Sequence, residues 1–129
     1  TDVGTSQARW SIGADQFFMH GESAASGLAS VVADFAGYVS VRSRRRPEGW
    51  QATQLVIASS YSRETSLAET FWSEDGQSAT TTAQPPPDTD KVYPVTDEMR
   101  VNVTDPFSAM MTMLERLLKL VKAICHNCS

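Results

Sequence analysis

The feature that most constrains the fold is a long amphipathic pattern near the C-terminal end. Apolar residues recur at steps of three and four from Phe107 to Ile124, which is the period of an α-helix packed along one side. Asp105 can accept hydrogen bonds from the free amides of the first turn, and Pro106 suits the first helical position. The pattern predicts a helix over residues 105–124. Its apolar arc covers about half the cylinder, so we expect deep burial.

The chain before this helix alternates between apolar and polar residues, which is the period of half-buried β-strands. A short helical turn is predicted over residues 28–35, and residues 1–7 are expected to form a frayed lead-in. The extended segments are predicted at residues 9–15, 17–25, 38–44, 50–60, 64–73 and 78–84.

Turn residues divide these segments. The Asp75-Gly76 step is the strongest hairpin signal, because glycine takes the positive φ that a tight reversal requires. Three prolines from Pro85 end the sheet and begin a connector over residues 85–104. Strands followed by one helix predict an α+β, mainly β, single domain over residues 1–129. We expect a curved antiparallel meander, half-barrel-like, of five or six strands, with the C-terminal amphipathic helix packed on it.

The same patterns predict a core shared by the strands and the helix. The expected core residues are Trp10, Ile12, Val41, Leu55, Ile57, Phe71, Met110, Leu114, Leu117 and Val121.

Composition excludes two classes of function. The 11 Lys and Arg residues against 15 Asp and Glu give a net charge of −4, whereas nucleic-acid binders carry a basic surplus. No apolar run approaches the roughly 20 residues of a transmembrane helix. We therefore expect no nucleic-acid partner and no transmembrane segment.

A run of arginines, Arg42, Arg44, Arg45 and Arg46, is the densest charge in the chain. Guanidinium groups bind phosphate or acidic headgroups through paired donors, and strand alternation would place Arg42, Arg44 and Arg46 on one face. The run is thus a candidate anion patch. The alternative is an edge strand protected by its charge.

His20 and Glu22 lie two residues apart on a predicted strand, so both side chains can face the same way. Such a pair can act as an acid/base couple in an enzyme of unknown class, or it can be purely structural. No Gly-x-Ser-x-Gly motif accompanies it. We therefore assign no catalytic residues.

Cys125 and Cys128 are the only cysteines and can at most close a small local disulfide. Covalent haem attachment needs a histidine directly after the second cysteine, where this chain has Ser129. A zinc site lacks further ligands at a workable spacing. We expect neither a cofactor nor a metal.

Several short motifs occur in a fixed order along the chain, at residues 26–30, 75–76, 85–88 and 93–96 and at the helix start over residues 104–111. Together they resemble a proteobacterial family of unknown function, the domain-of-unknown-function family thirty-one-oh-eight. The similarity runs from about Ala8 to Lys119.

The resemblance implies an exported, periplasmic or envelope-associated protein built of antiparallel strands, without established catalytic residues. It also implies further strands after the helix, so we expect a longer natural chain and self-association or docking of this one. The function expected is a non-enzymatic module that binds an apolar or lipid-like ligand or serves as an interaction subunit.

Overall fold

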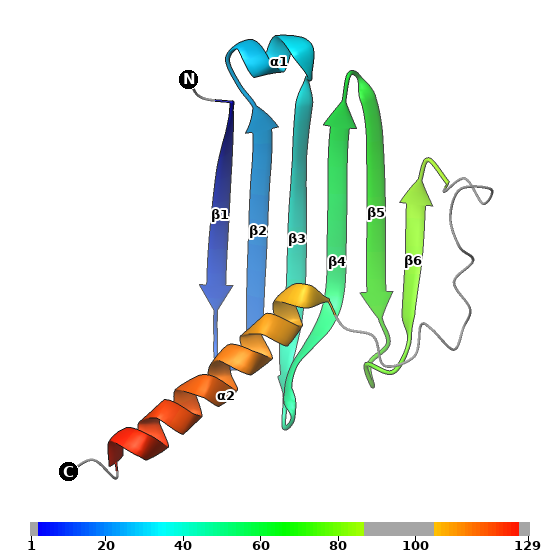
Figure 1. Ribbon diagram of the computed structural model, residues 1–129. Coiled ribbons are helices and arrows are strands. Elements are labelled where there is room, and N and C mark those ends of the chain that lie inside the picture. The colour runs from blue at the N-terminus through cyan, green and yellow to red at the C-terminus, as the bar shows by residue number, and fades with distance from the viewer. Residues whose placement is uncertain (1–2, 87–104, 127–129) are drawn as a thin grey trace.

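The computed structural model describes residues 3–86 and 105–126, and it contains one six-stranded antiparallel sheet with strands in chain order (Figure 1). The predicted meander with one C-terminal helix is confirmed, and the sheet is not closed. The elements are β1 (Gly4–Ile12), β2 (Gln16–Ala25), α1 (Leu28–Val32), β3 (Phe35–Arg46), β4 (Gly49–Tyr61), β5 (Glu64–Trp72), β6 (Ala79–Gln84) and α2 (Pro106–His126).

The N-terminal segment is a strand where a frayed lead-in was expected. β1 begins at Gly4, which pairs with Ala25 of β2. Residues 4–7 carry no apolar side chain that would mark them as a strand. The backbone ladder with β2 holds this segment in place. The short predicted helical turn is confirmed as α1, between β2 and β3.

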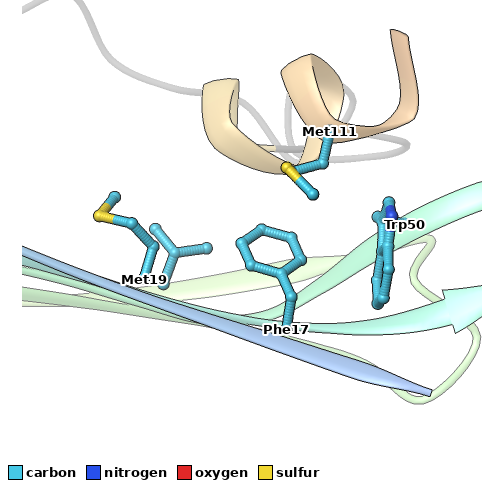
Figure 2. Close-up of a cluster of buried hydrophobic side chains, with 5 residues drawn as sticks. Phe17, Met19, Trp50 and Met111 are labelled. Atoms are coloured by element: carbon cyan, nitrogen blue, oxygen red, sulfur yellow. The ribbon is translucent and has the colours of Figure 1, made fainter. Parts of the chain in front are cut away.

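Strand alternation gives the sheet two different faces. Phe17, Met19 and Val41 point to the side where α2 lies, and with Trp50 and Met111 they form the buried apolar cluster. Figure 2 shows Met111 descending from α2 toward the ring of Phe17, with Trp50 beside it. The Phe17 and Trp50 rings meet edge to face at 5.2 Å between centroids, an arrangement that favours their quadrupoles.

The predicted core was largely wrong. Val41 is fully buried and Leu55 packs partly buried against the cluster. The other eight are substantially exposed, namely Trp10, Ile12, Ile57, Phe71, Met110, Leu114, Leu117 and Val121. One reason is that α2 covers only one end of the sheet and then extends obliquely past the ends of β1 and β2 (Figure 1). Phe71 shares the face of Phe18, opposite α2, so the helix does not cover it.

α2 is held on the sheet by its polar edge. The Oγ1 atom of Thr112 accepts a hydrogen bond of 2.9 Å from the backbone N–H of Trp50, and the buried hydroxyl of Ser108 forms a hydrogen bond with that of Ser43.

Asp105 caps the helix as predicted, accepting from the Ser108 N–H at 2.9 Å. Thr112 occupies the space where a Cβ atom at Gly49 would lie, so glycine there permits the close approach. The deep cradle expected for the helix is therefore absent from the described residues.

The opposite face of the same end is covered by the turn between β5 and β6. Gly76, at a φ of 73°, is buried against the side chain of Gln51, and Arg44 donates to the carbonyl of Glu74. The predicted Asp75-Gly76 reversal is confirmed. This end of the sheet is thus packed on both faces, while the end that carries α1 is not.

Candidate functional site

A wide trough of about 1260 Å³ lies on the sheet face turned away from α2, at the end that carries α1. By strand alternation, two neighbouring cross-strand rows direct their side chains into it. One row is Thr5, Ala24, Ala36, Ser60 and Thr65, and the other is Gln7, Glu22, Tyr38, Ala58, Leu67 and Gln84.

The trough forms because the sheet curves. Gln7 of β1 and Gln84 of β6 belong to opposite edges of the sheet, yet both line the same cavity. The open half-barrel expected from the sequence is therefore present at this end. The floor of the trough lies close to the backbone of the central strands, because Ala24, Ala36 and Ala58 have small side chains that leave the space above them open.

The row directly behind the trough, on the α2 side, also consists of small residues. Ser6, Ser23, Gly37, Ser59 and Ser66 lie opposite one another across five strands. Hydroxyl pairs join Ser6 to Ser23 at 2.8 Å and Ser59 to Ser66 at 2.7 Å. We call this set the serine row. No bulky side chain of the row packs behind the trough.

The charge of the trough is one-sided. Glu22 and Glu64 are the charged residues that line it, and no Lys, Arg or His is among the lining residues. Glu22 directs its side chain into the trough, whereas Glu64 shares the face of Ser66 on its strand and so faces the α2 side. Tyr38 and Leu67 supply the larger apolar surfaces beside the alanine floor. The cavity therefore combines an apolar floor with an acidic rim, which disfavours an anionic ligand.

His20 and Glu22 lie on the same face, as predicted, and they contact each other beside the trough. The Oε1 atom of Glu22 lies 2.8 Å from Nε2 of His20, and Oγ of Ser40 lies 2.6 Å from Nδ1. An ionised carboxylate only accepts hydrogen bonds, so Nε2 donates to Glu22. In the tautomer that carries its proton on Nε2, Nδ1 accepts from the Ser40 hydroxyl. Tyr38 packs against the imidazole at 5.3 Å between centroids.

This line of three side chains can relay a proton, but it lacks part of an acyl-transfer site. The backbone of β3 around Ser40 pairs with β2 on one side and β4 on the other. The described strands therefore offer no free pair of N–H groups to hold an oxyanion at Ser40. Ser40 was missed from the sequence, because its position opposite His20 depends on the register between β2 and β3.

The four arginines do not form one patch. Arg45 binds Glu115 of α2, Arg44 binds a turn carbonyl, and Arg42 lies over the Phe18 ring at 5.1 Å. Arg46 lines a small hollow with Trp50 and Thr112. The edge-strand interpretation is also wrong, because β3 lies between β2 and β4. A β-bulge between Arg42 and Ser43 further shifts the register against β4.

The charge of Arg45 is engaged by the carboxylate of Glu115 on α2. Its hydrogen bonds to the Glu115 carboxylate raise the pKa of the Arg45 guanidinium and lower the pKa of Glu115, whose partial burial acts in the opposite direction. The guanidinium also lies over the Trp50 ring, 4.4 Å from its centroid. Arg45 is therefore engaged in docking α2 and is not available to an external anion.

The remaining sequence candidates supply no site. Cys125 is an exposed free thiol near the end of α2, while Cys128 and residues 87–104 of the predicted connector lie outside the described residues. Within residues 3–86 and 105–126, no three His, Cys, Asp or Glu side chains gather as a metal site would require. Over the same residues, neither helix has the length and hydropathy of a membrane span.

Together, these features define an open antiparallel half-barrel with a large open trough and a C-terminal helix. Comparisons of the chain with protein-family models, with curated proteins and with solved structures found no match. The resemblance to the family of unknown function, and the exported compartment that it implies, therefore stay predictions.

Proposed function

We propose that this protein is a non-enzymatic binding module that holds an apolar ligand in the trough. The observation that carries the proposal is the continuous cavity of about 1260 Å³ spanning both edges of the sheet. The proposal keeps the periplasmic or envelope setting that the family resemblance implies.

The size and lining of the trough support a long ligand. Small-molecule sites usually enclose roughly 300–1,000 Å³, and the trough exceeds that range while staying open to solvent. Its alanine floor brings a ligand close to the strands, and Tyr38 and Leu67 offer apolar contact. A compact polar metabolite would leave most of this surface uncovered.

A neutral apolar dye, N-phenyl-1-naphthylamine, provides the test. We expect its fluorescence to rise on binding the wild-type chain and to fall to near background with Ala58→Trp, because the indole fills the floor of the trough. Val56→Trp is the matched control: Val56 is on the same strand and face, outside the lining. Equal dye binding by both variants would refute the trough as the site.

A second candidate function is that of a hydrolase, favoured by the hydrogen-bonded line of Ser40, His20 and Glu22. On this hypothesis Ser40→Ala and His20→Gln abolish hydrolysis of an activated ester such as p-nitrophenyl acetate. Both variants would leave dye binding in the trough unchanged. Hydrolysis that survives both substitutions would exclude this candidate.

A further inference from the structure

The connection between β2 and β3 forms an apolar tip at the open end of the trough. Three of its side chains are almost fully presented to solvent: Leu28 is 76% exposed, Val31 is 82% exposed and Val32 is 86% exposed. Residues 23–33 carry no charged side chain. We call Leu28, Val31 and Val32 the α1 tip.

The α1 tip is continuous with the trough. Ala24 at the end of β2 and Ala36 at the start of β3 flank the tip in sequence, and both line the cavity. Figure 1 shows α1 bridging these two strands at the end of the sheet farthest from the turn between β3 and β4. A ligand that enters at the tip therefore reaches the trough along β2 and β3 without crossing the packed end.

The composition of the α1 tip and of the trough suits a membrane surface. An uncharged tip with three exposed aliphatic side chains loses no ion solvation on entering hydrocarbon, whereas each buried apolar side chain gains free energy there. The Glu22 carboxylate, whose side chain faces the trough, complements the cationic choline of a zwitterionic headgroup and repels an anionic one. A trough larger than a metabolite site suits an acyl chain.

We infer that the α1 tip docks on a bilayer and that the trough takes up an acyl chain of a zwitterionic phospholipid there. The ligand class rests on the proposed function of the trough, while docking by the tip does not. Association is reversible, because three aliphatic side chains anchor far more weakly than a membrane span.

Flotation with vesicles of dioleoylphosphatidylcholine tests the docking step. We expect Val31→Asp to weaken vesicle binding at least tenfold. Gln77→Asp is the matched control, because it adds the same charge to the exposed turn at the other end of the sheet, and it is expected to bind as the wild type does. Leu117→Glu is also expected to float normally. Loss of binding with Leu117→Glu but not with Val31→Asp would assign docking to α2 and overturn the inference, as would no flotation of the wild type.

Transfer of a fluorescent phosphatidylcholine out of donor vesicles tests the uptake step. We expect Ala58→Trp to keep vesicle binding and lose at least nine tenths of the transfer, while Val56→Trp retains both. Equal or faster transfer of labelled phosphatidylglycerol would overturn the headgroup assignment. A wild-type chain that binds the naphthylamine dye in the trough but transfers no lipid would overturn this inference while the proposed function stands. Absence of dye binding would instead reject the proposed function itself.

Discussion

Arg45 of β3 and Glu115 of α2 form a two-point ion pair, with Nη1 to Oε2 at 2.9 Å and Nη2 to Oε1 at 2.7 Å. This is a parallel arrangement that fixes both position and orientation of the two elements. Arg45 also donates from Nε to the carbonyl of Ala14, at 2.7 Å. One side chain thereby joins the helix, β3 and the turn between β1 and β2.

The pair makes part of the stability of this protein dependent on pH. Arg45 lowers the pKa of the Glu115 carboxyl below its ordinary value of 4.5. A carboxyl with a lowered folded-state pKa contributes fully above its unfolded-state pKa, and the contribution is lost as the pH falls through the folded-state value. We expect Glu115→Gln to be less stable than the wild type at pH 7 and equally stable near pH 2.

Urea unfolding of both chains at several pH values measures this difference. Lys122→Gln, on an exposed part of the same helix, serves as the control and should show a constant difference across the series. A gap for Glu115→Gln that widens in acid would contradict the sign of the pKa shift.

Two phenylalanines test where the core lies. Phe17 is 2% exposed within the buried cluster, whereas Phe71 is 48% exposed. Phe17→Ala is expected to lower the free energy of unfolding by about 3–5 kcal/mol, because it leaves a cavity beneath Met111. Phe71→Ala should cost about 1 kcal/mol, since much of its ring is already in water. Similar losses in urea unfolding would show that the core extends to Phe71.

The buried turn at Gly76 should resist substitution for reasons of backbone conformation. Its φ of 73° costs a residue with a Cβ atom about 1–2 kcal/mol, so Gly76→Ala is expected to destabilise the chain by that amount. The overlap with Gln51 involves the end of a flexible side chain, which can move. We therefore expect Gln51→Ala to restore little of the lost stability when combined with Gly76→Ala. Full recovery in the double variant would assign the loss to the side-chain overlap instead.

The exposed apolar side of α2 is expected to drive self-association. Leu117 is 54% exposed and Val121 is 53% exposed, on the same side of the helix as Met110 and Leu114. Apolar surfaces of this extent are uncommon on monomers. Sedimentation velocity should show an average mass that rises with concentration, and combined Leu117→Gln and Val121→Gln should return it to that of one chain. Lys119→Gln is the control, and a wild-type chain that stays monomeric would contradict the prediction.

The order of elements was predictable because its signals are local. Alternation marks each strand, Asp75-Gly76 marks a reversal, and Asp105 marks the start of the helix. The core was not predictable in this way, because it depends on which side of α2 meets the sheet. Met111 and Leu114 are both apolar and three residues apart, yet the first is buried and the second exposed. The polar contacts at Ser108, Thr112 and Glu115 orient the helix, and only the tertiary structure reveals them.

The same division holds at the candidate site. His20 and Glu22 were identified because two positions along one strand share a face. Ser40 joins them through strand register, and Ala58 enters the trough through the curvature of the whole sheet. The edge-strand interpretation of the arginine run failed because alternation does not reveal that β3 is an interior strand. Alternation also does not reveal the bulge at Thr53 of β4 that shifts the register after Arg42.

The serine row behind the trough gives the two ends of the sheet different mechanical properties. Where Phe17 and Trp50 interlock with α2, bending the strands would break apolar packing. Where Ser23, Gly37 and Ser59 form the back of the trough, bending only shifts small side chains and hydroxyl pairs. We therefore expect bending of the sheet at that end to cost less free energy than at the packed end. On the proposed function, we expect the width of the trough to adjust to its occupant, so that ligands of different thickness fit while the end packed against α2 keeps its shape.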